Sequence, residues 1–175
     1  MKKSLTFSSL AAGTKAAGDG RYPEKQAMTA LHRAIDCGIT TIDTSALYGQ
    51  GRAERMTGKV MATRRQEVCL VSEVVSGAAN RWLSRRFCQA SLKRLQTDHI
   101  DFYILHRRYP GLLASAVRNL ERLRQEGLIG GWGVADFDVR DIKQLLALPG
   151  GENCRINKVM YHCAARGPEY RLLDQ

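Results

Sequence analysis

Four polar side chains stand at the ends of short apolar segments that have the length of β-strands. They are Asp43, Glu73, His106 and Asp136. The carboxyl ends of parallel strands meet at one edge of a sheet, so we expect these groups to lie close together. Carboxylates and imidazoles transfer protons, and two carboxylates with one imidazole can also bind a divalent metal ion. The sequence therefore predicts a polar site at one edge of a sheet.

The strand-like segments recur regularly, with starts 28, 32, 30 and 26 residues apart. They are Ile39–Asp43, Glu67–Val74, His99–His106, Ile129–Asp136 and Arg155–Tyr161. A weaker strand is expected near Leu5–Ala12. Helical spacing of apolar residues predicts helices between the strands, at Glu24–Cys37, Arg52–Thr63, Trp82–Ala90, Leu113–Leu123 and Val139–Leu148. Alternating strands and helices of this kind are typical of a parallel sheet covered by helices.

Two parallel architectures fit such an alternation, the doubly wound sheet and the eight-stranded β/α barrel. The dinucleotide-binding pattern G-x-G-x-x-G is absent, since neither Gly49–Gly51 nor Gly130–Gly133 has the required spacing. Polar residues at the carboxyl ends of the strands are typical of the barrel. We therefore predict an α/β fold of the (β/α)8 type, with residues 1–175 as one domain that contains about six of the eight units.

The composition excludes several classes of protein. The chain has 175 residues, of which 44% are hydrophobic and 25% charged, which is typical of a globular protein. The net charge of +10 attracts phosphate groups but does not distinguish nucleic acid from a phosphorylated cofactor. No apolar run is long enough for a membrane helix. The five scattered cysteines form no C-x-x-C pair, which predicts reduced thiols and a cytoplasmic protein.

Several ordered segments carry a resemblance to a known family. They are IDTSALYG (Ile42–Gly49), the spacing of Glu54 and Gly58 after it, Ser91–His106, Glu126–Phe137 and Asn157–His162. Together they resemble the aldo-keto reductase family, in which an Asp ends one strand and a Tyr follows five residues later. Residues Leu148–Asp174 are similar to the bacterial branch of that family. The resemblance extends over nearly the whole chain.

The resemblance implies an NADPH-dependent reduction of an aldehyde or ketone to an alcohol. On the matching positions, Tyr48 is the acid, Asp43 the supporting carboxylate and His106 the imidazole that orients a small carbonyl substrate. A phenol is a poor proton donor near neutral pH unless a cation lies beside it, and the family places a lysine there. Cofactor contacts are expected at the matching positions Asp43, Ala135, Asp136 and Lys158.

The sequence departs from the family at the lysine, because Glu73 occupies that position. Two neighbouring carboxylates would raise the pKa of one of them, and the added negative charge would disfavour a tyrosinate. We therefore expect slow reduction, since loss of acid–base assistance costs ~100- to 10,000-fold. Ala135-Asp136 replaces a Ser-Asn pair and Lys158 replaces a Gln, which changes the hydrogen-bonding groups available to the nicotinamide.

A complete barrel takes about 250 residues, so we expect the last two strands to be missing from this chain. The family's contacts to the NADP phosphates lie largely in that part, which predicts weakened NADP(H) binding. The first and sixth strands would then be open edges, and we expect self-association through them.

Three alternatives stay open. The first is a degenerate reductase without turnover, acting as a relic or an interaction module. The second is a metal-dependent hydrolase or lyase that uses Asp43, Glu73 and His106. The third is a nucleic-acid-binding protein, with basic pairs as its contact surface, although solvated helix faces fit those pairs better and we expect no nucleic-acid partner. The pairs are Arg64-Arg65, Arg85-Arg86, Lys93-Arg94 and Arg107-Arg108.

Overall fold

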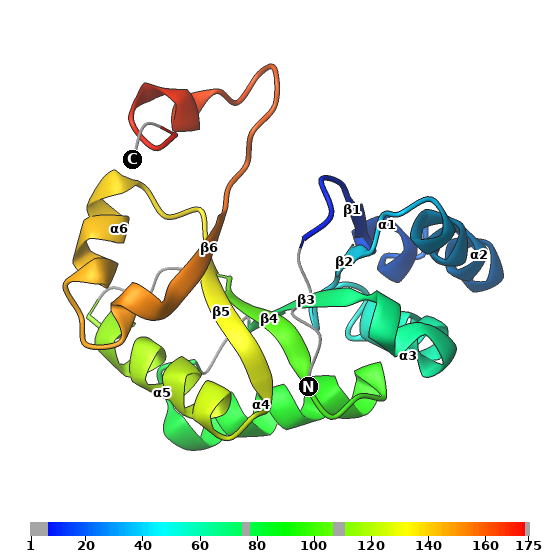
Figure 1. Cartoon of the computed structure of the whole chain (residues 1–175), viewed down its shortest axis with the longest axis horizontal. Coiled ribbons are helices and arrows are strands. Elements are labelled where there is room, and N and C mark those ends of the chain that lie inside the picture. The colour runs from blue at the N-terminus through cyan, green and yellow to red at the C-terminus, as the bar shows by residue number, and fades with distance from the viewer. Residues whose placement is uncertain (1–6, 75–77, 107–110, 174–175) are drawn as a thin grey trace.

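The strands form one curved sheet in a computed structural model that describes residues 7–74, 78–106 and 111–173. The six strands are all parallel and lie in sequence order, β1-β2-β3-β4-β5-β6. Figure 1 shows them as a curved wall with helices on its outer side. The strands are β1 (Ala11–Gly13), β2 (Thr41–Asp43), β3 (Cys69–Val74), β4 (Ile100–Leu105), β5 (Ile129–Ala135) and β6 (Cys154–Lys158).

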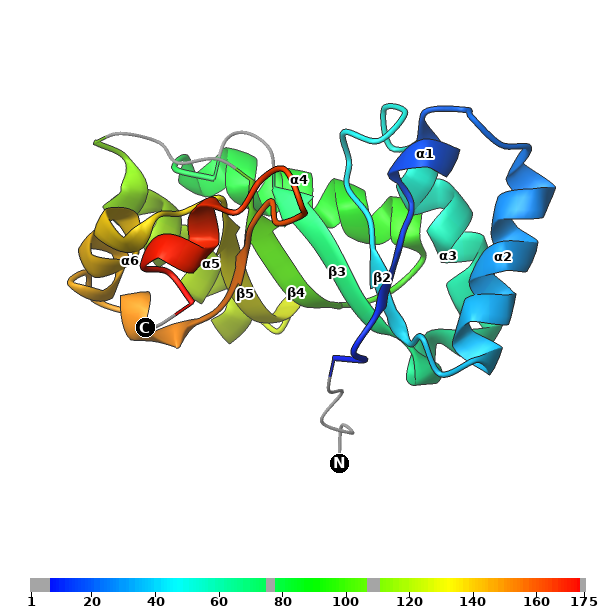
Figure 2. The ribbon, with the colours of Figure 1, turned by 90° about the horizontal axis from the view of Figure 1, so that it is seen from above.

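Helices connect consecutive strands and cover the outer face. Figure 2 shows α2 and α3 side by side at one end of the sheet and α5 and α6 at the other. The α-helices are α1 (Lys15–Gly18), α2 (Glu24–Asp36), α3 (Arg52–Arg64), α4 (Arg81–Leu95), α5 (Leu113–Gln125) and α6 (Val139–Leu146). Short 3-10 turns cover Arg65–Glu67, Gly151–Asn153 and Gly167–Tyr170. Among the described residues, no helix is long and apolar enough to cross a membrane.

Alternation along each strand divides the side chains between two apolar clusters. On β4, Tyr103 and Leu105 point outward into the main core under the helices. Phe102 and Ile104 point to the opposite, concave face, where a smaller cluster forms with side chains of neighbouring strands. The same alternation carries the polar residues at the strand ends to the concave face, so the strand period decides which groups can meet there.

Glu54 and Gly58, two positions of the sequence motif, hold α3 against α4 and β3. Glu54 is fully buried, and its carboxylate accepts hydrogen bonds from Ser72 Oγ at 2.8 Å and Arg94 Nε at 2.6 Å. A Cβ atom on Gly58 would lie 2.6 Å from the backbone oxygen of Arg94. The two residues therefore fix the outer layer behind the strand that carries Glu73.

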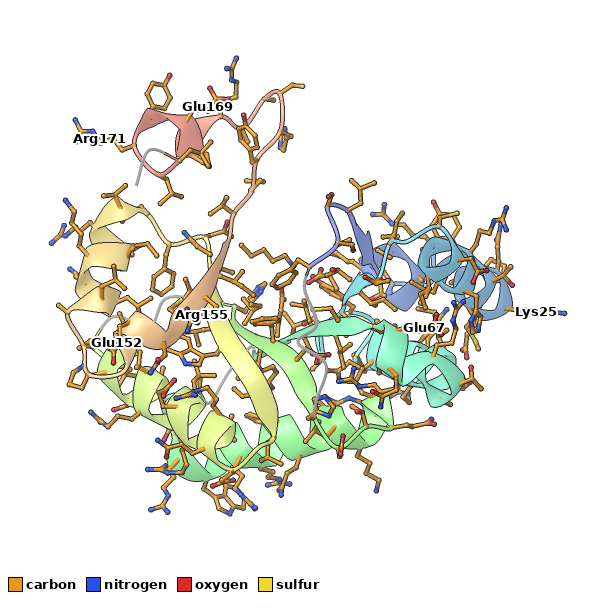
Figure 3. The ribbon with its side chains drawn as sticks, in the orientation of Figure 1. Lys25, Glu67, Glu152, Arg155, Glu169 and Arg171 are labelled. Atoms are coloured by element: carbon orange, nitrogen blue, oxygen red, sulfur yellow. The ribbon has the colours of Figure 1, made fainter. Side chains whose placement is uncertain are left out.

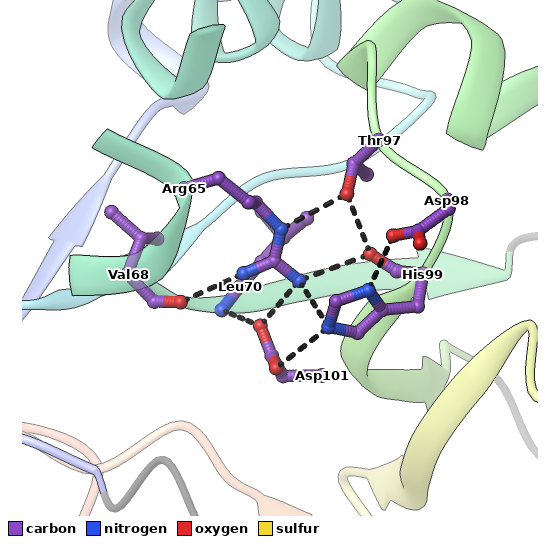
Figure 4. Close-up of polar contacts among 7 residues, drawn as sticks. All are labelled: Arg65, Val68, Leu70, Thr97, Asp98, His99 and Asp101. Atoms are coloured by element: carbon purple, nitrogen blue, oxygen red, sulfur yellow. Dashed lines mark hydrogen bonds and ion pairs between the residues drawn. The ribbon is translucent and has the colours of Figure 1, made fainter. Parts of the chain in front are cut away.

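A polar network stabilises the opposite, amino-terminal end of β3 and β4 (Figure 4). The Arg65 guanidinium lies 2.9 Å from Asp101 Oδ2 and donates hydrogen bonds to Thr97 Oγ1 and to the backbone oxygens of Val68 and His99. Asp101 Oδ2 in turn accepts a hydrogen bond from the backbone N–H of Leu70 at 2.8 Å. These contacts join the start of both strands far from the predicted site.

The expected order of strands and helices is confirmed, with boundary differences of a few residues. The weakest expectation, a strand near Leu5–Ala12, corresponds to β1 at Ala11–Gly13, and residues 1–6 lie outside the described part. The last strand was expected to reach Tyr161, but β6 ends at Lys158. Helix α1 was not expected, because a single helical turn shows no apolar periodicity.

Replacing Gly58 by Ala is expected to destabilise the chain. The added methyl group would meet backbone atoms of Arg94 and Leu95 at 2.6 and 2.8 Å, which cannot move away as a flexible side chain can. Overpacking costs ~1–3 kcal/mol, which exceeds the ~1 kcal/mol by which Ala favours a helix over Gly. Urea unfolding measures the difference.

Gly13→Ala is the matched control, because no atom lies within 4 Å of its Cβ position. We expect its free energy of unfolding to stay within about 0.5 kcal/mol of the unaltered chain. Equal stability of the two variants would contradict the packing role of Gly58.

Candidate active site at the carboxyl ends of the strands

Side chains from four strand ends converge on the concave face of the sheet. Asp43 ends β2, Glu73 is the penultimate residue of β3, and Lys158 ends β6. His106 directly follows β4, and its backbone N–H donates to the oxygen of Val74 at 3.1 Å. Of the four strand-end groups that the sequence predicted at one edge, Asp43, Glu73 and His106 lie together, whereas Asp136 is exposed and contacts the backbone of Met160 instead.

Lys158 connects two of these groups from the far edge of the sheet. Its Nζ atom lies 2.9 Å from both carboxylate oxygens of Asp43 and 2.8 Å from Glu73 Oε1. The two carboxylates are 20% and 2% exposed, whereas Lys158 is 39% exposed. The ammonium therefore compensates two acids that the sheet largely removes from water, and the acids raise the pKa of Lys158 despite its own burial.

The burial of Asp43 affects the pKa of its carboxyl group. Its pKa is raised, first by burial and further by the charge of Glu73, while Lys158 opposes both effects. The sequence-based expectation that neighbouring carboxylates raise a pKa thus holds for Asp43, although burial is the larger cause.

The second oxygen of Glu73 faces the imidazole of His106. His106 Nδ1 lies 2.9 Å from Glu73 Oε2, close enough for an ion pair when the ring is protonated. The alignment does not suit a hydrogen bond, and neither atom has a hydrogen-bond partner among the described residues. These two buried atoms therefore face each other without a hydrogen bond.

Tyr48 lies in the loop between β2 and α3, half-buried beside these charges. Burial and the charges of Glu73 and Asp43 raise the pKa of its hydroxyl, while Lys158 lowers it through its charge and a side-chain hydrogen bond. The next residue, Gly49, has φ +58°, and a Cβ there would overlap the carbonyl of Gly18 at the end of α1. The loop that carries Tyr48 is thus pressed against α1.

The residues expected to contact a nicotinamide differ in burial and in the contacts of their side chains. Ala135 is buried at the end of β5 and has no polar side chain. Asp136 is exposed, with φ +56°, and its Oδ1 accepts a hydrogen bond from the backbone N–H of Met160 at 3.1 Å. It borders a groove of about 1130 Å³ between α6 and residues 159–172. Lys158 instead points to Asp43 and Glu73.

The metal-site alternative gains no support from this geometry. Among residues 7–74, 78–106 and 111–173, no group of three or more His, Cys, Asp or Glu side chains is arranged to hold a metal ion. The ammonium of Lys158 bonds both carboxylates that such an ion would need.

In each described basic pair singled out in the sequence, at least one arginine contacts an acid. Arg64 contacts Asp36 and Glu67, and Arg85 contacts Glu126. Arg65 and Arg94 contact Asp101 and Glu54, and Arg107-Arg108 lies outside the described residues. Figure 3 shows other basic side chains far apart, with Lys25 on α2 and Arg171 in the C-terminal segment pointing outward from opposite parts of the chain.

Sequence reasoning missed the connection between Lys158 and the two carboxylates. Lys158 is 115 residues from Asp43 and 85 from Glu73, and the strands that carry them are not neighbours in the sheet. The one available signal was the pair of opposite charge changes at Glu73 and Lys158, each at the carboxyl end of a predicted strand.

The chain is similar over most of its length to known proteins of one family. The model of the Aldo/keto reductase family matches residues 9–173. Methylglyoxal reductase YeaE of Escherichia coli is 38% identical over 161 residues, covering 92% of this chain and 57% of its own length. Aldo-keto reductase YhdN of Bacillus subtilis is 32% identical, covering 82% of this chain and 48% of its own length.

A solved structure shows the same fold. The crystal structure of an aldo/keto reductase from Klebsiella pneumoniae in complex with NADP and acetate superposes with a TM-score of 0.93 at 38% identity. It covers 99% of this chain and 61% of its own, so the chain spans about half to three fifths of the length of the relatives it matches. The six parallel strands thus correspond to part of a (β/α)8 barrel, as the sequence predicted.

Removing the ammonium should make stability depend more strongly on pH. In Lys158→Met, both carboxylates lose their cation, so the pKa of Asp43 rises further above its usual value. A group with a raised pKa in the folded state stabilises at low pH, and this contribution is lost as the pH rises through that pKa. We expect the variant to lose about 1–3 kcal/mol at pH 7 relative to the unaltered chain, and less near pH 4.

Urea unfolding at both pH values measures this effect. Adding Asp43→Asn to the variant should remove much of the pH dependence, because one of the two unpaired acids is gone. A loss of stability that is equal at both pH values would contradict the electrostatic role of Lys158.

Proposed function

The chain belongs to the aldo/keto reductase family, and we propose that it reduces a small aldehyde or ketone to an alcohol with NADP(H). The observation that carries the proposal is the convergence of Tyr48, Asp43, His106 and Lys158 on the concave face of the sheet. Because a relative is named methylglyoxal reductase, small 2-oxoaldehydes are the first substrate class to test.

The residues of this chain fit the protonation half of such a reaction. Hydride addition to a carbonyl carbon leaves negative charge on the oxygen, which must receive a proton. Tyr48 donates its hydroxyl proton to that oxygen, and water returns a proton to the tyrosinate. The ring of His106 would orient the carbonyl group, and its Nδ1 atom lies 2.9 Å from Glu73 Oε2. NADP(H), when bound, supplies the hydride and is oxidised to NADP+.

The fit to the cofactor is partial. A carboxylate can accept several hydrogen bonds, so Asp136 would hold the amide NH2 of a nicotinamide while still accepting from Met160. Ala135 offers no polar side chain, and the ammonium of Lys158 is engaged with Asp43 and Glu73. This supports weaker NADP(H) binding than a full set of amide contacts would give.

We propose that turnover is slow rather than absent. Burial, Glu73 and Asp43 raise the pKa of Tyr48, which makes the phenol a weaker acid, and Lys158 offsets part of that effect. The alternative is a non-catalytic degenerate reductase that serves as an interaction module, which the loss of polar side chains at Ala135 favours.

The remaining expectations on partners and location are retained as proposals. The engaged basic pairs support the absence of a nucleic-acid partner. All five cysteines are free thiols, which supports a reducing, cytoplasmic environment.

We also propose that the chain self-associates through the edges of its sheet. Among the described residues, β1 and β6 each pair with one strand only, so each has one side open to another strand. Sedimentation velocity over a range of concentrations is expected to show reversible association. A single monomeric species at every concentration would contradict the proposal.

Tyr48→Phe is the test of the proposed reaction. The variant keeps the ring but loses the proton, so we expect NADPH consumption with methylglyoxal to fall ~100-fold or more while NADPH binding, followed by cofactor fluorescence, stays unchanged. Tyr170→Phe is the control, because Tyr170 is 84% exposed.

An equal rate in Tyr48→Phe and the unaltered chain would overturn the role of Tyr48. NADPH binding without any turnover by the unaltered chain would favour the degenerate alternative.

A further inference from the structure

The position of Lys158 is fixed by backbone contacts before its side chain reaches across the sheet. Lys158 pairs with Ala135 in the parallel register of β5 and β6, and its backbone oxygen accepts from the N–H of Asp136 at 2.8 Å. Its ammonium then contacts carboxylates of β2 and β3 on the other side of the concave face. A lysine placed only for solubility would extend into water, so this geometry points to a specific role.

Glu73 explains why the ammonium is held there. Asp43 engages the ammonium with both oxygens, and Glu73 adds a third contact from a side chain that is only 2% exposed. Leaving Glu73 without this partner would bury an unpaired charge, which is strongly unfavourable. The acid on β3 and the base on β6 therefore depend on each other.

We propose that Lys158 supplies the cation that position 73 lacks beside Tyr48, a positive charge that comes from β6 and is anchored by Asp43 and Glu73. When Tyr48 gives its hydroxyl proton to a carbonyl oxygen, it becomes a tyrosinate, and the nearby ammonium stabilises that negative charge. Lys158 therefore acts on the reaction through Tyr48, by holding a positive charge beside its hydroxyl, and is a positioning residue. Its part in turnover rests on the proposed function, whereas its effect on Tyr48 can be measured without turnover.

Other charged groups near Tyr48 either favour or disfavour its ionisation. Asp43 from β2 and Glu73 from β3 disfavour the tyrosinate, and Lys158 from β6 favours it. Lys15 from α1 lies 5.8 Å from the centre of the Tyr48 ring, but it is 66% exposed and paired with Asp19. His106 faces Glu73, with Nδ1 2.9 Å from Oε2. Lys158 is therefore expected to dominate over Lys15.

The test measures the ionisation of Tyr48 in the full chain without cofactor. Tyrosine labelled with carbon-13 at Cζ reports the phenol directly by NMR, and Tyr48→Phe identifies the signal. Opposite charges within a few ångströms shift a pKa by ~1–3 units, so Lys158→Met should raise the Tyr48 pKa by about one unit or more. Lys158→Arg keeps the charge and should restore most of that shift.

Glu73→Gln is an independent test, in which the expected shift of the Tyr48 pKa has the opposite sign. It removes a negative charge without removing the ammonium, so we expect the Tyr48 pKa to fall below that of the unaltered chain. A purely structural role of the pair would not produce opposite shifts from the two substitutions. This arm also keeps the test decisive if Lys158→Met unfolds in alkaline solution.

Lys15→Met is the matched control, a second lysine removed near the same ring, and we expect a much smaller shift. Equal shifts in Lys15→Met and Lys158→Met, or no fall in Glu73→Gln, would overturn the inference. The predicted pKa shifts without any turnover would support the inference and refute the proposed function. Failure of the inference can therefore be distinguished from failure of the proposed function.

Discussion

Two carboxylates stand at the carboxyl ends of β2 and β3, and the sheet that positions them also removes them from water. Glu73 is almost fully buried and Asp43 is largely so. Burying two like charges side by side is unfavourable unless a cation lies between them. Lys158 is that cation, at 2.8–2.9 Å from both groups. The geometry of the site therefore depends on bringing β6 opposite β2.

The curvature of the sheet meets that requirement. A flat sheet of six strands would place β2 and β6 four strand spacings apart, ~19 Å at the usual separation of neighbouring strands, which no lysine side chain can bridge. Strand twist curves a parallel sheet of this kind, and the helices pack along its outer side (Figure 1). The ion pairs of the site therefore require the curved sheet, which brings the end of β6 across from β2.

The local sequence pattern predicted which residues end each strand. It did not predict which distant strands the curvature of the sheet would bring together. Strand period and spacing placed Asp43, Glu73 and His106 at one edge, because each ends its own apolar segment. Lys158 was assigned to the cofactor by its matching position, since the direction of a long side chain across a concave face is not encoded locally. Helix α1 was missed for a related reason: its single turn is defined by the close approach of Gly18 to the Tyr48 loop.

Glu73 has two opposing effects on the ionisation of Tyr48. It holds the ammonium of Lys158, which favours a tyrosinate at Tyr48, yet its own charge disfavours the same tyrosinate. Its second oxygen lies 2.9 Å from His106 Nδ1, so the same carboxylate also faces the imidazole. The two carboxylates outnumber the one ammonium, and their excess negative charge weakens Tyr48 as a proton donor.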